Sequence, residues 1–544
     1  LLFCIMSVVA LFCATDSYPI NIANRAGCDT LIMKGSYNQL KRMEAVVMEQ
    51  LQNKPTMAMK GYMYALLGDI YVALGDYKTG LEWYRKGESA YSKVDFSKED
   101  DDELYYYMQC LYNYASLQFE MGGYLEEIMD KCTKSVGLVA RWSPFALQWL
   151  SEEKMYEKIM YSSFQIEQFL CWIETLGRKY PQAIEALQKN LAALEKDLYG
   201  NGVKCDLEYG QILELIARMY QSSTNYEEAL AYLQRSLGYF ERACGKNSVH
   251  YARVLVQIGE IYHMLNDIVL AEEYFLRSKD ILVGKGFVEH TTLAEAYSGM
   301  GMIFLAKGNI SKADEYLCKA CSMQEKLCGE DSFPAVLAKL NSAYPPIFQG
   351  NLNKARDIVS QVMKNRTFMG NISSDHFANA LVTSVEILLV TQSYKEVIAL
   401  NEEIEELFVM SENLSRYPIR NYYLNLGRAY KRSGDYKNAV EQFNKVLEQQ
   451  RAITHDNFSF LTEEQRSNLW KLDKTRIGSL FSINMAGQDV VPQVGSMLYD
   501  VALLNKGILL QASINLAEVI SSSGDEELKK EFTDLRLYMQ SPQA

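Results

Sequence analysis

The side chains best suited to catalysis or metal binding are eleven cysteines and five histidines. Cys318 and Cys321 form the only CxxC pair, and no second pair follows to complete a tetrahedral zinc site. No histidine stands in a cysteine or aspartate context that would activate a nucleophile. A Gly-rich phosphate loop and an HExxH helix are also missing. The sequence therefore predicts no catalytic residue, no metal site, no cofactor and no enzymatic activity, and it predicts cysteines that pack as small apolar residues.

A second kind of chemistry is binding through a polar helix face. Helical spacing puts three cations and two amides on one face: Asn421, Asn425, Arg428, Lys431 and Arg432. Such a set can hold a carboxylate or an acidic peptide. The alternative is a helix face that is merely solvated. Toward the middle of the chain the equivalent positions are mixed in sign: Arg218, Gln221, Arg253, Gln257 and Glu260.

The segment Tyr422–Gln449 shows which elements would position these side chains. Its apolar residues recur at helical spacing in two runs, which predicts two antiparallel helices. Between the runs, Gly434 can adopt positive φ and Asp435 can cap the second helix. Because neither helix can bury its apolar stripe alone, the unit requires neighbours of the same kind.

The pattern recurs every 42 residues. The first helix carries a mostly small residue at Ala217, Gly259, Gly301, Ala343, Val385 and Gly427, and the second at Ala229, Ala271, Ala313, Ala355, Val397 and Ala439. Small residues at these positions let paired helices approach closely. In one unit Pro345 and Pro346 fall inside the first helix, where proline must end or kink it.

Upstream the register is looser. Tyr64–Gly87 is a good copy of the unit, whereas Leu111–Ser135 and Cys171–Ala193 are poorer copies. Ser36–Asn53 is predicted to be a lone helix that caps the array. Asp95–Glu103, with its run of acidic residues, is predicted to be an exposed loop.

The unit resembles the tetratricopeptide repeat, whose signature appears here as Leu426-Gly427, Tyr430, Ala439 and Phe443. The long period is similar to the kinesin-light-chain style of that repeat. The resemblance implies an all-α, right-handed superhelical solenoid of about nine helical hairpins, TPR-like and in 42-residue units, with a C-terminal long-helix extension. It also implies that a protein or peptide partner binds in the concave groove.

The pattern divides the chain into five parts. Residues 1–15 resemble the apolar core of a secretory signal peptide. N-terminal capping helices are predicted for 28–57, degenerate TPR-like units for 58–200 and six regular units for 205–452. A helical joining segment is predicted for 455–544.

The charge balance limits the classes of partner that this chain could bind. The formal net charge of −13 disfavours nucleic acid and anionic lipid, because both reward basic surfaces. Nothing in the sequence indicates a small-molecule substrate. The signal-like segment predicts export, to the periplasm or outside a bacterial cell, with membrane association only through an uncleaved N-terminal segment.

The last part carries a second resemblance. Phe460–Arg466, Leu498–Leu503 and Lys506–Leu510 look like the segment that joins such repeats to a CHAT domain, a family named after caspases and HetF associated with TPRs. The resemblance implies the regulatory repeat portion of a caspase-like protein, whose catalytic domain and any protease activity lie outside this chain. The alternative is the TPR sensor region of a membrane-anchored bacterial signalling regulator, with Met497–Ser521 as the candidate membrane helix.

Overall fold

The computed structural model describes residues 25–96, 101–123, 127–128, 130–135, 138, 180–197, 206–222, 225–364, 374–401, 416–457, 480, 483, 493–502 and 529–530. Within these ranges the regular elements are helices, without a strand. The N-terminal module comprises α2 (Arg25–Lys34), α3 (Tyr37–Leu51), α4 (Met57–Ala73), α5 (Tyr77–Tyr91) and α6 (Asp101–Glu120). The repeat array comprises α9 (Tyr180–Asp197), α10 (Asp206–Ser222), α11 (Tyr226–Cys244), α12 (Val249–Met264), α13 (Ile268–Gly284), α14 (Thr291–Ala306), α15 (Ile310–Cys328), α16 (Phe333–Asn341), α17 (Tyr344–Phe348), α18 (Leu352–Lys364), α20 (Ser374–Val390), α21 (Tyr394–Ala399), α23 (Arg416–Arg432) and α24 (Tyr436–Asn457).

The hairpin turns have the geometry that the repeat pattern predicts. In α23–α24, Gly434 has φ +83° and Asp435 Oδ1 accepts a backbone N–H of the first turn of α24 at 3.2 Å. In α4–α5, Gly75 has φ +78° and Asp76 caps α5 in the same way at 3.1 Å. A positive φ is open to glycine without strain, and the aspartate satisfies one of the orphan donors at the helix start. Both predictions are confirmed.

The small residues of the first helices face large residues of the second. A methyl group added at Gly427 would lie 2.4 Å from the Phe443 ring, and one at Gly259 would lie 2.9 Å from the Phe275 ring. Glycine therefore admits the aromatic ring that the partner helix inserts. This contact is the physical origin of the repeating small position.

This close approach predicts the effect of one added methyl group. Gly427→Ala is expected to lower the free energy of unfolding by about 1–3 kcal/mol, because the Phe443 ring must move away. Urea unfolding of the two proteins measures the difference. The matched control is Gly284→Ala, where no heavy atom lies within 4 Å of the new carbon. Equal stability losses in the two variants would contradict the packing argument.

The prolines act as predicted, whereas the acidic loop does not. α16 ends at Asn341 and the short α17 begins at Tyr344, so the first helix of this unit is broken beside Pro345. The expected loop Asp95–Glu103 is wrong at its C-terminal end, because α6 already begins at Asp101.

The cysteine pair is also placed differently from the prediction of core packing. Cys318 is exposed and Cys321 is only partly buried on α15, whereas Cys28, Cys110 and Cys328 are buried. Across the described residues, no group of three His, Cys, Asp or Glu side chains is arranged to hold a metal ion.

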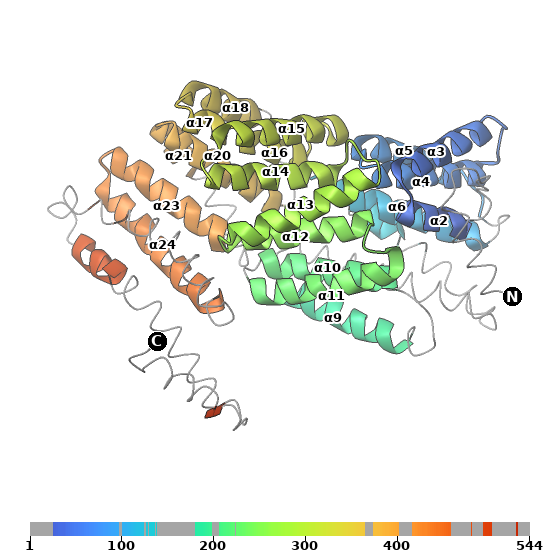
Figure 1. Cartoon of the computed structure of the whole chain (residues 1–544), viewed down its shortest axis with the longest axis horizontal. Coiled ribbons are helices and arrows are strands. Elements are labelled where there is room, and N and C mark those ends of the chain that lie inside the picture. Colours follow the sequence, from blue (N-terminus) through green and yellow to red (C-terminus); the bar gives the residue numbers. More distant parts are fainter. Residues whose placement is uncertain are drawn as a thin grey trace.

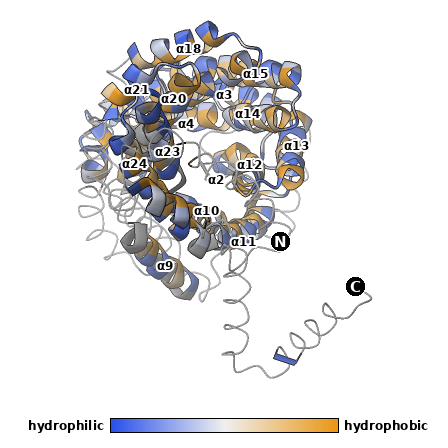
Figure 2. Ribbon diagram, turned by 90° about the vertical axis from the view of Figure 1, so that its left-hand side faces the viewer, coloured by the Kyte–Doolittle hydropathy of each residue, from blue (hydrophilic) through white to orange (hydrophobic). Residues whose placement is uncertain are grey.

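The array curves, and the N-terminal module packs against its middle. Seen end-on, its helices follow an arc from α9–α11 through α12–α15 to α18–α24 (Figure 2). The module, drawn in blue, lies against the region of α12 to α15 (Figure 1), and α5 contacts α15 while α2 contacts α12. The solenoid therefore folds back on itself, which the prediction of a simple linear array did not include.

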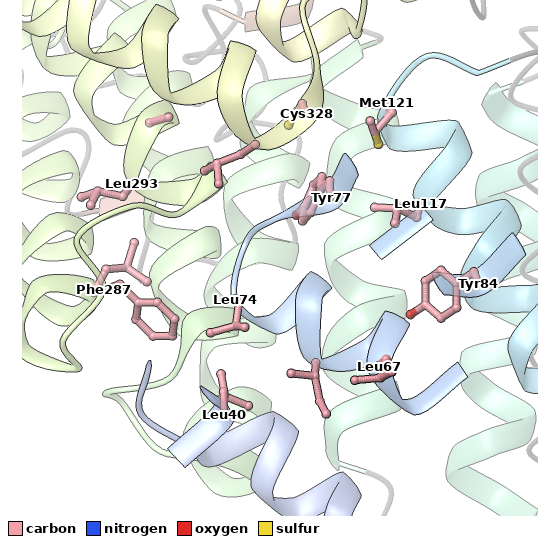
Figure 3. Packing of buried hydrophobic residues seen from close by; sticks show 14 of the residues in the cluster. Leu40, Leu67, Leu74, Tyr77, Tyr84, Leu117, Met121, Phe287, Leu293 and Cys328 are labelled. Carbon is pink, nitrogen blue, oxygen red and sulfur yellow. The ribbon is translucent and has the colours of Figure 1, made fainter. Parts of the chain in front are cut away.

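One hydrophobic cluster joins the two parts, and we call it the seam. It contains Leu40 and Leu74 from the module together with Phe287 and Leu293 from the array (Figure 3). Backbone hydrogen bonds close it at both ends, from Tyr37 N to Lys285 O at 3.2 Å and from Phe333 N to Met121 O at 3.0 Å. The helices predicted as an N-terminal cap at 28–57 are thus also buried against the middle of the chain.

Several predictions fall outside the described residues. These are the signal-like segment 1–15 and the CHAT-like motifs at 460–466 and 506–510. Of the predicted long helix Met497–Ser521, only the stretch up to residue 502 is described. Among the helices that are described, none combines the length and the hydropathy needed to cross a membrane.

Candidate functional site

The polar face predicted on α23 is only partly accessible. Arg432 is exposed, Asn421, Arg428 and Lys431 are half-buried, and Asn425 is buried with 4% of its surface exposed. α23 packs against α20, α21 and α24, which explains why the amide positions face neighbours. The accessible part of the predicted face therefore comprises its three cations and part of Asn421.

These cations lie close enough to influence one another. Burial, followed by the charges of Arg432 and Arg428, lowers the pKa of Lys431. The fully buried Arg420 lies about two helical turns before them on α23 and donates to Gln450 Oε1 at 2.6 Å and to Asn421 Oδ1 at 3.2 Å. The arrangement is a positively charged patch, built on a helix whose N-terminal half is fixed by buried polar contacts.

A larger feature is a cavity of about 740 Å³ between the N-terminal module and the array. Its walls come from α2, α4 and α6 on one side and from α10, α12 and the start of α14 on the other. The ionisable side chains in its lining include Asp29, Asp69, Glu120, Glu208, Glu214, Arg218, Arg253, His250 and His290. The volume lies within the usual range of ligand sites in proteins.

The centre of the lining is the carboxylate of Glu214, whose side chain is 4% exposed. It accepts two hydrogen bonds from Arg253, at 2.8 and 2.7 Å, and one from Gln257 Nε2 at 2.7 Å. Against the effect of burial, Arg253 and Arg218 hold the pKa of Glu214 below its usual range. A two-pronged arginine contact of this kind fixes both side chains in one geometry.

Arg218 extends this network across to the module. Its Nη2 lies 3.6 Å from Glu214 Oε1 and 3.4 Å from Oε1 of Glu120, which stands at the end of α6. Glu120 and Arg218 are 98 residues apart in the chain. The charged network therefore links the two parts of the protein on the cavity side, as the seam links them through apolar contacts.

Asp69 on α4 forms a second polar centre in the lining. Its Oδ1 accepts from Tyr84 Oη at 2.5 Å and from Asn113 Nδ2 at 2.8 Å. Burial raises the pKa of Asp69 to about 7, against the lowering effect of these two donors. The nearby charge of Asp29 raises it as well. The carboxyl is thus held in a place that costs free energy to ionise.

The two histidines of the lining carry no charge at neutral pH. Burial lowers the pKa of His250 to about 3 and that of His290 to about 4. His290 has a structural role, since its Nδ1 accepts from Thr292 N at 3.1 Å and caps α14. The charge of the cavity is therefore set by carboxylates and guanidiniums.

Part of this site follows from the repeat pattern. Arg218, Arg253 and Gln257 were expected on the groove face, and the structure gathers them around Glu214. Glu214, Glu120 and Asp69 were missed, because their partners lie on other helices. One related signal was available in the repeat. Glu295 lies one 42-residue period after Arg253, so the repeat places a carboxylate on the same face as this arginine.

Comparison with known families identifies the repeat. Two family models described as tetratricopeptide repeat match the chain. One matches residues 208–282, and the other matches residues 61–93, 294–327 and 421–452. These stretches include the hairpins α4–α5, α10–α13, α14–α15 and α23–α24. The resemblance to the tetratricopeptide repeat is confirmed.

One curated relative is response regulator aspartate phosphatase E of Bacillus subtilis (strain 168), which is 24% identical over 161 residues. The match covers 30% of this chain and spans 42% of that protein, less than half its length.

Among solved structures, a Rap protein complexed with competence and sporulation factor has a TM-score of 0.49 at 13% identity, covering 74% of this chain and 99% of the other. The Rap conjugation gene regulator of the plasmid pLS20, in complex with the Phr* peptide, has a TM-score of 0.45 at 12% identity, covering 75% and 99%.

Proposed function

We propose that this tetratricopeptide repeat protein is an interaction scaffold that holds an extended peptide, or a segment of a protein partner, in the cavity between its N-terminal module and its repeat array. One observation carries the proposal: a cavity of about 740 Å³ lies between the inner helices of both parts, and polar and aromatic side chains are among those that line it. Tetratricopeptide repeats present their first helices as an extended concave surface, which suits such a partner.

The charged side chains of the cavity are also preorganised. They are fixed by mutual contacts, as in the pair of Glu214 and Arg253, so binding of a peptide costs little conformational entropy at these side chains. Because the walls belong to two separate parts of the chain, a guest that touches both stabilises their association by mass action.

Occlusion of the cavity tests this proposal. Peptides selected from a display library on the intact chain should lose binding to Ser116→Trp, because Ser116 lines the cavity and an indole would fill it. The control is Val269→Trp on the outer face of α13, where the native side chain is 75% exposed. Equal binding to wild type and both variants would place the peptide site elsewhere and overturn the proposal.

The positive patch of Arg428, Lys431 and Arg432 supports a second contact surface, for an acidic segment of a partner. The double variant Arg428→Glu/Lys431→Glu should lose at least tenfold in affinity for a partner captured through this face. Titration of the purified partner by calorimetry, at low and high salt, measures the change. Unchanged affinity would remove the patch as a site.

The cellular setting also belongs to the proposal. The apolar run at residues 1–15 supports export, and the motif at Leu498–Leu510 supports association with a caspase-like CHAT domain. The alternative is a sensor segment of a membrane-anchored signalling regulator. Fractionation of expressing cells tests export, and the reading frame after Ala544 separates the two: a CHAT domain supports the first, and a membrane helix with a signalling domain supports the second.

A further inference from the structure

The charge of the cavity is unbalanced. Its lining carries five carboxyl groups and two guanidiniums, so with neutral imidazoles the formal charge is 2 − 5 = −3 when every carboxyl is ionised, and it stays negative when Asp69 is protonated. The guanidiniums are already engaged, since Arg253 binds Glu214 and Arg218 lies between Glu214 and Glu120. A guest that brings positive charge is therefore favoured over one that brings negative charge.

The environment of Asp69 gives this preference a location. Both of its donors, Tyr84 Oη and Asn113 Nδ2, bond the same oxygen, Oδ1. Within the described part of the chain Oδ2 receives no donor, and the side chain lines the cavity. The charge that acts on its pKa is that of another carboxylate, Asp29, which also lines the cavity. A carboxyl held here lacks the cation that would offset the cost of its burial.

Aromatic rings line the module side of the same cavity. Tyr62, Tyr84, Tyr105 and Tyr106 all belong to its lining. Tyr62 and Tyr106 stand edge to face at 5.4 Å between ring centres, and Tyr105 and Tyr106 at 5.3 Å. Tyrosine rings attract ammonium and guanidinium groups to their faces, and a nearby carboxylate strengthens that attraction.

We infer that the cavity recognises a basic peptide, and that a lysine or arginine side chain of this peptide is anchored at Asp69, beside Tyr84 of α5 and on the wall that also carries the tyrosines of α4 and α6. The inference rests on the proposed function and specifies its ligand class. A bound ammonium would give Asp69 the missing opposite charge, hold it ionised and displace a proton from it near neutral pH. Binding is then accompanied by proton release.

The cationic anchor is tested with three libraries of acetylated, amidated octapeptides. The libraries are identical except at one fixed position, which holds Lys in the first, Gln in the second and Glu in the third. The intact chain should retain the Lys library at least tenfold better than the Gln library, and the Glu library least. Asp69→Asn keeps the size of the side chain and an oxygen for Tyr84 and Asn113, so it should abolish the Lys preference and keep the binding of the Gln library. The control is Asp357→Asn on α18, which leaves the preference intact.

The outcomes separate this inference from the proposed function. Retention of all three libraries without a Lys preference, or a preference for Glu, overturns the cationic anchor while the peptide cavity stands. If none of the libraries is retained, and Ser116→Trp does not change the binding of the peptides selected by display, both the cationic anchor and the peptide cavity are overturned. Calorimetry with spermidine alone is the third arm: tight binding that requires Asp69, with no peptide retained, would replace the peptide by a free amine and overturn the inference. For a lysine peptide, calorimetry in two buffers of different ionisation enthalpy should show proton release that Asp69→Asn removes.

Discussion

Glu214→Ala is expected to lower the free energy of unfolding by roughly 3–5 kcal/mol, one of the largest effects of any single substitution in this chain. The carboxylate is nearly inaccessible and joins Arg253, Arg218 and Gln257. Removing it leaves Arg253 without its two-pronged carboxylate partner, Arg218 with Glu120 alone, and Gln257 without its acceptor. Urea or thermal unfolding measures the loss.

Two controls separate the buried network from ordinary ion pairing. Glu185→Ala removes a carboxylate from an exposed pair with Lys189 at 2.7 Å and should leave the free energy of unfolding almost unchanged. The double variant Glu214→Leu/Arg253→Leu removes both central charges and should cost less than Glu214→Ala alone. If the double variant were the less stable of the two, the cost would lie in lost packing rather than in an unpaired charge.

The second large effect is a loss of stability with rising pH. Burial raises the pKa of Asp69 to about 7; burial, followed by the charges of Glu260 and Glu120, raises that of Glu295 to about 8. A carboxyl with a raised pKa binds more protons in the folded than in the unfolded chain between its two pKa values. The stability it contributes is therefore present at low pH and is lost as pH rises through 7 to 8.

The effect of the carboxyls on stability can be separated from that of the buried histidines by the choice of pH range. His250 and His290 have lowered pKa values, so the stability they contribute rises with pH and is complete about one unit above their unfolded pKa of about 6.5; above pH 6.5 they oppose the fall by less than about 1 kcal/mol. Between pH 6.5 and 8.5 the two carboxyls should lower the free energy of unfolding by roughly 2–3 kcal/mol. Urea unfolding across this range measures it, and Asp69→Asn/Glu295→Gln should make the decline shallower. Glu260, whose pKa burial also raises to about 7, accounts for part of the decline that remains. A stability that rises over this range would contradict the assignment.

The repeating unit could be predicted from the sequence because its contacts are local. The small and large partners Gly427 and Phe443 are 16 residues apart, as are Gly259 and Phe275, so one hairpin contains each complete contact. The turn at Gly434 and the break beside Pro345 depend on the chemistry of single residues. Each of these features was readable without knowledge of the whole fold.

The return of the N-terminal module to the array could not be read in this way. Lys285 Nζ donates to the backbone oxygen of Lys34, 251 residues earlier, and no period in the sequence relates these positions. Their meeting depends on the curvature summed over many units. The cavity shares this origin, so Asp69 and Glu120 were missed although the groove positions of Arg218 and Arg253 were anticipated. The α23 face, by contrast, was visible in the sequence, but the burial of Asn425 by neighbouring helices was not.

The seam has a consequence for the order in which the chain can fold during synthesis. Leu40 and Leu74 leave the ribosome long before Phe287 and Leu293, with which they share a cluster, and the last backbone contact of the seam comes from Phe333. At ordinary translation rates of about 5–20 residues per second, the apolar side of the early helices stays uncovered for roughly ten seconds or more. During that interval it is a surface for chaperones or for the same surface on a neighbouring nascent chain. We therefore expect slower translation between residues 121 and 333 to lower the yield of native protein.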